Sequence, residues 1–296
     1  MTDTQHCGYV ALVGRPNVGK STLLNHLVGR KLAITSRKPQ TTRHNLLGVH
    51  TEGSAQALIV DTPGIHDPGS RAMNRYLVRT ATSVLQDVDV VVQVVERIRI
   101  TDDDRLVMGH VAKSRAVRIC AINKVDELDD RAKLLPQIEA LHALGVFGEI
   151  VPISALKNDN LDRLKAVVLA RLPPGPHLFP PDQITDRSER FMAGEIVREK
   201  LMRRVGDELP YHATVSIEGF RAKSGIVEID ATIHVERDGQ KAIVIGSGGA
   251  RLKSIGQDAR ADIERLLGRK VMLRLWVKVR PGWSANDSAL RRMGYD

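Results

Sequence analysis

Residues 14–21 restrict the fold of this chain more than any other segment, because they read Gly-Arg-Pro-Asn-Val-Gly-Lys-Ser directly after the apolar run 9–13. The pattern G-x-x-x-x-G-K-[ST] needs a strand before it and a helix after it. Its glycines let successive backbone N–H groups point at phosphate oxygens, and the helix N-terminus adds positive potential. We therefore predict a phosphate-binding loop made of Gly14, Arg15, Pro16, Asn17, Val18, Gly19, Lys20, Ser21 and Thr22.

Two motifs are placed to act on a triphosphate and its metal ion. In the loop, Lys20 would contact the β- and γ-phosphates, and the Ser21 hydroxyl would ligate Mg²⁺. The motif D-T-P-G at residues 61–64 closes the next strand-like apolar run. There Asp61 would hold Mg²⁺ through water, and the Gly64 amide would sense the γ-phosphate. An ordinary Asp-x-Pro-Gly turn is the competing interpretation of this motif.

A polar loop between these motifs reads Gln40-Thr-Thr-Arg43. A mobile loop at this place needs a threonine hydroxyl to complete the Mg²⁺ coordination when a γ-phosphate is bound. We choose Thr42 for this role and keep Thr41 as the alternative; an ordinary polar loop is the competing interpretation. The predicted catalytic residues are therefore Lys20, Thr42 and Gly64, and the predicted metal ligands are Ser21, Thr42 and Asp61.

The motif Asn123-Lys-Val-Asp126 follows a further apolar run and predicts which base is bound. The Asp126 carboxylate can accept hydrogen bonds from N1–H and the 2-amino group of guanine, whereas adenine would leave it buried and unpaired. Lys124 can lie along the base, and Asn123 can tie neighbouring loops together. A backbone N–H of Ser154-Ala155 would lie near guanine O6. We predict a GTP/GDP site whose further contacts are Thr62, Pro63, Ile65, Asn123, Lys124, Val125, Asp126, Ser154 and Ala155.

Strand-like and helix-like segments alternate through residues 8–172, which is typical of an α/β domain with a mostly parallel sheet and helices on both faces. The expected strands are 9–13, 57–60, 88–95, 117–122 and 150–153, and the expected helices are 21–27, 71–85, 104–113, 131–144 and 161–172. Five prolines and a glycine in residues 171–181 end this pattern. We predict a GTPase domain at 1–172, a proline-rich linker at 173–186, a smaller α+β domain at 187–283 and a tail at 284–296.

The second half follows a different α+β pattern. Its expected elements are a helix at 188–204, strands at 213–220 and 225–235, a strand-like run at 242–245, a basic helix at 250–267 and a strand at 270–279. The glycine cluster before the basic helix resembles the G-x-x-G loop of a KH domain, which holds about four nucleotides of single-stranded RNA. The predicted RNA contacts are Gly246, Ser247, Gly248, Gly249, Arg251 and Lys253. The tail is either a short helix or a loose end.

Charge and composition limit the classes of ligand that the chain can bind and the compartment in which it is expected. The formal net charge is +9, and residues 251–280 carry nine basic and three acidic side chains, which favours RNA or anionic lipid but also fits an ordinary solvated face. Aromatic residues make up only 3% of the chain, so base stacking cannot be a major part of RNA binding. Cys7 and Cys120 have no disulfide or zinc pattern, and no run approaches the ~20 apolar residues of a membrane span. We expect a cytoplasmic protein.

The motifs G-R-P-N-V-G-K-S, T-T-R, D-T-P-G, N-K-V-D and S-A, in this order, resemble the translation-factor-like GTPases of bacteria. From residue 8 to about 294 the whole chain resembles the Era family, and the likeness includes segments 36–43, 198–202, 208–211, 275–279 and Gly282-Trp283. The resemblance implies a type II KH domain in the second half and GTP/GDP with Mg²⁺ in the first. It also implies a monomer that binds small-subunit (16S) ribosomal RNA near its 3′ end and aids maturation of the immature 30S subunit, with γ-phosphate setting whether the RNA domain is presented.

The resemblance carries further implications at Ile65 and Asn17, and the chain departs from it at Ser247-Gly248. Many GTPases carry glutamine where this chain has Ile65, and the Era-like families share the apolar replacement, which implies slow unassisted turnover. Relatives use the residue at Asn17 to help bind K⁺. Relatives also commonly carry lysine as the second middle residue of the G-x-x-G loop, where this chain has Ser247-Gly248. One phosphate contact is then missing, and binding is expected to rest more on Arg251, Lys253 and Arg260.

Two other functions compete with this interpretation. A membrane-associated signalling GTPase would dock its basic second domain on anionic lipid, but a strong amphipathic helix with an aromatic edge is absent from the sequence. Peripheral contact with the inner membrane stays open as a secondary property. A non-enzymatic RNA-binding scaffold would not need Lys20, Ser21, Asp61 and Asp126 together.

Overall fold

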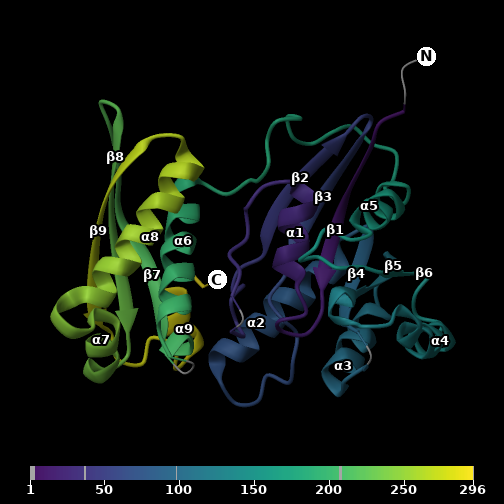
Figure 1. The fold of residues 1–296 in the computed structure, drawn as a ribbon, viewed down its shortest axis with the longest axis horizontal. Helices are drawn as coiled ribbons and strands as arrows, with labels where there is room; N and C mark the ends of the chain where they lie inside the picture. Colours follow the sequence, from purple (N-terminus) through teal and green to yellow (C-terminus); the bar gives the residue numbers. More distant parts are fainter. Residues whose placement is uncertain (1–3, 37, 98, 207–208, 296) are drawn as a thin grey trace. The chain divides into compact units, whose positions relative to one another are not determined.

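The computed structural model describes residues 4–36, 38–97, 99–206 and 209–295, which form two compact units (Figure 1). The first unit comprises Met1–Ala33, Thr42–Ser70 and Asn74–Asp186, and the second comprises Ile34–Thr41, Arg71–Met73 and Arg187–Asp296. Arg37 and Glu208 of the family segments lie outside the described residues, as do residues 1–3 and 296 at the ends of the predicted domains. None of the described helices is both long and apolar enough to cross a membrane.

A six-stranded sheet forms the first unit, in the order β2-β3-β1-β4-β5-β6. Every neighbouring pair is parallel except β2 and β3. The strands are β1 (His6–Val13), β2 (Leu46–Glu52), β3 (Ala55–Asp61), β4 (Val90–Glu96), β5 (Val117–Asn123) and β6 (Glu149–Pro152). The sequence analysis missed β2, because Gly48 and three polar residues in its second half hide the apolar pattern of this antiparallel edge strand.

Helices cover both faces of this sheet. They are α1 (Lys20–Val28), α2 (Ala72–Ser83), α3 (Asp102–Val111), α4 (Leu135–Ala143) and α5 (Leu161–Leu169). On one face Ala11, Val13 and Cys120 pack with residues of α3 and α4 in a single buried cluster. Helices α1 and α5 contact each other and β3 on the other face (Figure 1). Cys120 is a fully buried core residue, and burial raises the pKa of its thiol.

The proline-rich segment after α5 is fastened to the first unit. The buried Gln56 side chain accepts hydrogen bonds from the backbone N–H groups of Leu178 and Phe179 at 2.9 and 3.0 Å and donates to the Phe179 carbonyl at 2.8 Å. Further along, the Val49 N–H donates to the Ile184 carbonyl at 2.9 Å. Prolines remove backbone donors, so one side-chain amide supplies much of the attachment.

The second unit contains a three-stranded sheet in the order β7-β8-β9, antiparallel and then parallel. Helices α6 and α8 contact each other and pack on one face of it (Figure 1). The elements are α6 (Glu189–Arg204), β7 (Ala213–Lys223), β8 (Ile226–Val235), α7 (Asp238–Ile245), α8 (Ala250–Leu267), β9 (Lys270–Val279) and α9 (Asp287–Arg291). A mostly parallel α/β unit followed by a smaller α+β unit confirms the predicted fold class.

Two details of the second unit differ from the sequence analysis or complete it. The run 242–245 is not a strand, because it forms the last turn of α7; four apolar residues cannot by themselves separate a strand from a helix, and the Gln240 side chain caps the start of this helix. The tail forms the short helix α9. Its Tyr295 stacks on the buried Trp283, with ring centroids 6.0 Å apart, and hydrogen-bonds Thr214 of β7 at 2.8 Å.

Candidate functional site

The loop at residues 14–21 is a tight turn between β1 and α1 that only glycine can form at two positions. Gly14 has φ +154°, and a Cβ atom there would lie 2.4 Å from the Val94 carbonyl oxygen. Gly19 has φ +103°, and its Cβ would lie 2.2 Å from Nδ2 of Asn123. Both positions therefore require glycine. The turn ends at the N-terminus of α1, where phosphate binds favourably.

Lys20 points back into this loop. Its Nζ donates to the carbonyl oxygens of Gly14 and Arg15, at 3.0 Å each, and the side chain is buried. Burial lowers the pKa of Lys20 to about 8, although the negative charge of Asp61 opposes the effect. A cation held in this low-dielectric position would gain strongly from a neighbouring phosphate.

The three predicted metal ligands lie together. Oδ2 of Asp61 accepts hydrogen bonds from Ser21 Oγ at 2.6 Å and from Thr42 Oγ1 at 3.2 Å, and the two hydroxyl oxygens are 2.8 Å apart. The hydroxyl of Thr41 instead donates to the Lys38 carbonyl at 2.7 Å. The structure thus brings Thr42, rather than Thr41, to the other two residues.

Asp61 is prepared to bind more than these two hydroxyls. It is fully buried, and burial raises its pKa, while the charge of Lys20 and the hydrogen bonds from Ser21 and Thr42 oppose the rise. Its other carboxylate oxygen, Oδ1, is buried without a hydrogen-bond partner among the described residues. Hard oxygen ligands with one oxygen unused fit Mg²⁺, which keeps waters and phosphate oxygens in its shell. The described residues contain no cluster of three His, Cys, Asp or Glu side chains that would form an all-protein metal cage.

The D-T-P-G motif reaches the phosphate loop through backbone contacts. A Cβ on Gly64 would lie 2.6 Å from the Pro16 nitrogen, so glycine allows the two loops to touch. The Ile65 N–H donates to the Gly14 carbonyl at 3.1 Å, but its side chain is fully buried in the core between the sheet and α3. The Thr62 hydroxyl donates to the Leu12 carbonyl at 2.8 Å and thereby anchors the motif to β1.

The base-recognition motifs form a second cluster. The Asn123 side chain donates to the Val18 carbonyl at 2.7 Å and accepts the Ala155 N–H at 2.9 Å, so it joins the phosphate loop to the loop after β6. Oδ1 of Asp126 accepts a hydrogen bond from the Ser154 hydroxyl at 2.5 Å. Asn123, Asp126 and Ser154 therefore lie in one polar constellation, as the motif spacing predicts.

Glu96 was missed by the sequence analysis. It ends β4 and forms ion pairs with both Arg15 of the phosphate loop and Lys124 of the base motif. Burial raises the pKa of Glu96, but the hydrogen bonds from Lys124 and Arg15 outweigh it and hold the pKa below its usual value. An acidic residue at the carboxyl end of a buried strand was the available signal. Ligands of open α/β sheets bind at this edge, and β1, β3, β5 and β6 also end here, at or within two residues of predicted site residues.

The glycine cluster of the second unit forms an exposed turn between α7 and α8. Gly246, Gly248 and Gly249 have φ values of +71°, +55° and +81°, which side-chain-bearing residues rarely adopt. A Cβ on Gly246 would lie 2.8 Å from the Cβ of Arg251. Ser247 and Gly248 are exposed at the tip of the turn. The backbone can therefore be approached closely from outside.

The basic residues after this turn differ in what they contact. The Arg251 guanidinium donates to the Ile243 carbonyl at the end of α7, so it also holds the two helices together. Lys253 is exposed on the first turn of α8, and Arg260 is exposed two turns later on the same side of the helix. Of the predicted cations, Lys253 and Arg260 are the most accessible to an anionic ligand.

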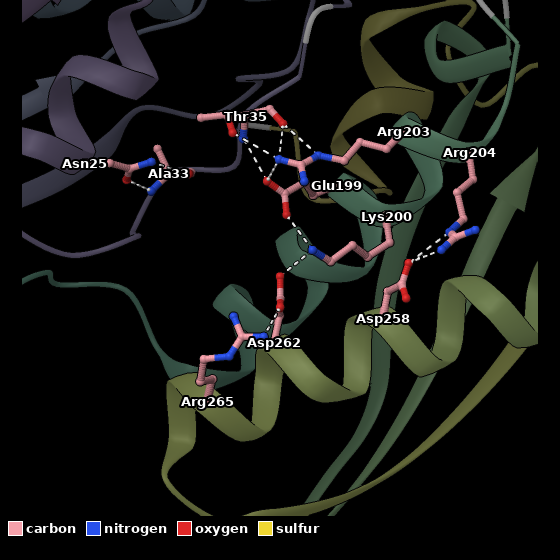
Figure 2. A network of polar contacts seen from close by, with 10 residues as sticks. All are labelled: Asn25, Ala33, Thr35, Glu199, Lys200, Arg203, Arg204, Asp258, Asp262 and Arg265. Carbon is pink, nitrogen blue, oxygen red and sulfur yellow. Dashed lines mark hydrogen bonds and ion pairs between the residues drawn. The ribbon is translucent and has the colours of Figure 1, made fainter. Parts of the chain in front are cut away.

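The loop segment Ile34–Thr41, which precedes Thr42, is bound to α6 of the second unit (Figure 2). The fully buried Glu199 carboxylate accepts the Thr35 N–H at 3.0 Å and a hydrogen bond from Arg203 at 2.9 Å. Its other oxygen accepts from Lys200 at 3.1 Å, and Lys200 also pairs with Asp262 of α8. One chain of hydrogen bonds and ion pairs therefore runs from this loop to the helix that begins at the glycine cluster.

Comparisons with known proteins identify both units. The family model described as 50S ribosome-binding GTPase matches residues 9–124, and the KH domain model matches residues 208–284. GTPase Era of Ectopseudomonas mendocina is 57% identical over 297 residues, covering 100% of this chain and 99% of that protein. GTPase Era of Pseudomonas aeruginosa is also 57% identical, over 98% of this chain and 95% of its own length.

Two solved structures share the whole fold. An Aquifex aeolicus Era variant bound to GDP and AlF4⁻ has a TM-score of 0.94 and 41% identity, covering 98% of this chain and 99% of its own. The same values hold for Era in complex with MgGDPNP and nucleotides 1506–1542 of 16S ribosomal RNA. The chain is more than half identical to GTPase Era of Ectopseudomonas mendocina over its full length, and its phosphate loop is followed in the sequence by a KH domain. The chain therefore belongs to the Era family of GTPases.

Proposed function

We propose that this chain hydrolyses GTP to GDP and phosphate at the carboxyl edge of the first sheet. Lys20 binds the β- and γ-phosphates, the Gly64 amide contacts the γ-phosphate, and Asp126 selects guanine. Ser21, Thr42 and Asp61 would hold Mg²⁺, which neutralises charge that develops on the phosphates. The convergence of Ser21, Thr42 and Asp61, with one Asp61 oxygen still unpaired, is the observation that carries the assignment. The solved relatives that contain GDP with AlF4⁻ or MgGDPNP support it.

Asp126→Asn tests the base assignment. The amide can no longer accept two hydrogen bonds from guanine, but it can donate one to the 2-oxo group of xanthine. We expect GTP affinity to fall about 100-fold, because two hydrogen bonds to a charged group are lost, and XTP affinity to rise. Nucleotide titration followed by phosphate release measures both. Unchanged GTP preference, or a preference of the wild type for ATP, would contradict the assignment.

Turnover without a partner is expected to be slow. The Ile65 side chain is buried in the core and cannot orient an attacking water. Asn17 has φ +65° in the phosphate loop, and we assign its side-chain oxygen to a K⁺ ion near the phosphates. Faster hydrolysis in K⁺ than in Na⁺ would support this role, and equal rates in the two salts would remove it.

The second unit is the RNA-binding part of the proposed function. We assign its ligand as small-subunit ribosomal RNA near the 3′ end, held by the backbone of residues 246–249 and by Arg251 and Lys253. The solved relative in complex with nucleotides 1506–1542 of 16S ribosomal RNA supports this choice over docking on anionic lipid. In the cell, the chain would act on the immature 30S subunit. Selective crosslinking of this rRNA segment tests the assignment, and equal crosslinking of unrelated RNA would count against it.

The Glu199 network gives a physical basis for coupling the two activities. A γ-phosphate and Mg²⁺ that fix Thr42 would also restrain segment Ile34–Thr41, whose Thr35 is bound by Glu199. Glu199 and Lys200 then connect this segment to α8. We expect Glu199→Gln to reduce the difference in RNA affinity between GTP-analogue and GDP forms, while GTP affinity stays within a few-fold. A full difference in the variant would exclude this route.

A further inference from the structure

Strand β9 presents two faces with different chemistry. Leu273, Leu275 and Val277 pack on the core beneath the helices, and the Leu275 side chain approaches Gly256 of α8. Side chains alternate along a strand, so the intervening residues face the opposite side of the sheet. That side, here called the outer patch, consists of Met272, Arg274, Trp276 and Lys278. Met272 and Trp276 are 41% and 44% exposed, which is unusual for the largest apolar side chains.

The C-terminal tail contacts one end of this outer face. Register pairs Trp276 with Thr232 and Lys278 with His234. At the His234 end, Tyr295 of the tail hydrogen-bonds Thr214, which is the β7 partner of His234. The tail therefore reaches Thr214 at this end, where His234 is 7% exposed, whereas Trp276 stays 44% exposed. The two tryptophans differ sharply as a result, because Trp283 is buried beneath the tail and Trp276 is not.

Positive charge accompanies the exposed indole. Lys278 is exposed and forms no ion pair with the residues that the structure describes, whereas Arg274 is paired with Asp230 at 2.7 Å. Burial lowers the pKa of His234, and the positive charges of Arg280 and Lys278 add to this effect, so these cations lie near the covered end of the face. Glu218, hydrogen-bonded to Ser216, offsets part of this charge.

We propose that the outer patch is a second RNA contact, at which an unpaired base stacks on Trp276 and Lys278 binds a neighbouring phosphate. Every base has a π-face that an indole can stack on, and residues two apart on one face of a strand are about 7 Å apart, within reach of a single nucleotide. An exposed indole beside an exposed lysine combines the two groups that bind single-stranded RNA, a stacking platform for a base and a cation for the phosphate. Few aromatics in the chain limit stacking to isolated positions, and this is one of them.

The inference rests on the proposed RNA-binding function and adds a surface separate from residues 246–249. Tryptophan fluorescence tests it directly, because the chain has two tryptophans and only Trp276 is exposed. A single-stranded RNA with the sequence of the 16S rRNA 3′ end is titrated into the full chain. We expect the RNA to quench the long-wavelength emission that comes from the exposed indole. Both this emission and its quenching should be absent in Trp276→Phe.

Two pairs of variants separate stacking from charge. Trp276→Leu keeps an apolar side chain without a π-face and should weaken RNA binding about fivefold or more, whereas Trp276→Phe should stay within twofold. Lys278→Gln should reduce the slope of log affinity against log salt by about 0.7, the loss of one phosphate contact on a single strand. Lys113→Gln, an exposed lysine of the first unit, should leave the slope unchanged. Thermal unfolding confirms that each variant is folded.

The outcomes distinguish this inference from the proposed function. If Trp276→Leu binds RNA within twofold of the wild type while Gly246→Asp with Gly249→Asp loses binding, the outer patch is not an RNA contact and the proposed function stands. If the wild type does not bind the RNA, both assignments fail. If Trp276 becomes shielded from iodide as protein concentration rises without RNA, the face contacts a second copy, and the inference is overturned.

Discussion

The nucleotide site and the glycine turn of the second unit would recognise phosphates by different means. In the first, Lys20, Asp61 and Asn123 are buried and held by hydrogen bonds, Lys20 within the phosphate loop and the other two from neighbouring loops. In the second, the turn is exposed and its conformation comes from three glycines with positive φ. The difference indicates that choosing one base and one metal needs buried, oriented side chains. Holding the sugar–phosphate backbone of an RNA needs only a stretch of protein main chain that the RNA can approach closely.

The largest effect should come from removing the buried cation of the first site. Lys20→Met should lower GTP hydrolysis about 1,000-fold, because a charge that stabilises the developing phosphate charge is lost. Single-turnover phosphate release measures it, with Lys113→Gln as a control for loss of an exposed lysine. A loss below tenfold would contradict the role of Lys20.

The same variant should change how stability depends on pH. The pKa of Lys20 is about 8 in the folded state, against 10.5 for an unperturbed lysine such as that of the unfolded chain. Between these two pH values the unfolded chain binds more protons than the folded one. The contribution of Lys20 to the free energy of unfolding therefore rises with pH across this window. Below pH 8 the burial cost is complete. Nucleotide-free Lys20→Met should therefore be more stable than the wild type at pH 7, by up to about 3 kcal/mol. Urea unfolding at pH 7 and 9.5 should show the advantage shrinking.

The corresponding change in the second unit should abolish RNA binding and leave the first site intact. Gly246→Asp with Gly249→Asp places carboxylates where phosphates approach and forces side chains into positive φ, so affinity should fall at least about 100-fold. GTP binding should stay within twofold. Filter binding and nucleotide titration on one preparation measure both. Unchanged RNA affinity would refute the assignment of the glycine turn.

Ile65→Ala tests whether the buried residue that follows Gly64 acts on the chemistry or on packing. Its side chain is fully buried in the core, so the free energy of unfolding should fall by about 2–5 kcal/mol. Phosphate release by the folded protein should stay within a few-fold of wild type. Ile65→Val, which leaves a smaller cavity, is the matched control. A hundredfold loss of rate in a folded variant would mean that Ile65 takes part in the reaction.

The smallest effect should come from adding a charge to the glycine turn. Gly248→Lys adds a cation at the tip of the turn, so RNA affinity should rise a few-fold at low salt and the salt slope should increase by about 0.7. Because Gly248 has φ +55°, the substitution should cost about 1 kcal/mol of stability. Gly248→Gln carries the same strain without the charge. Equal RNA affinity of the two variants would show that no phosphate lies near this position.

Much of the nucleotide site could be predicted because its residues form short motifs at the ends of strands. The spacing of Gly14, Gly19 and Lys20 fixes a turn that few other loops could adopt, and the structure has that turn. The elements with strong periodicity, such as α8 at Ala250–Leu267, were also predicted with correct bounds. Weakly patterned elements were not. The edge strand β2 was missed, and the end of α7 was assigned to a strand.

The sequence alone determined the parts whose conformation depends on neighbouring residues: the phosphate loop, the base motif, the glycine turn and the change of pattern at the prolines. Only the tertiary structure decided which distant groups meet. Glu96 pairs with Arg15 and Lys124, Gln56 fastens Phe179, and Glu199 binds Thr35. These contacts depend on strand order and on how elements pack, which local patterns do not encode. The exposure of Trp276 was decided in the same way, because packing of the helices on the other face of β9 leaves this side chain 44% exposed.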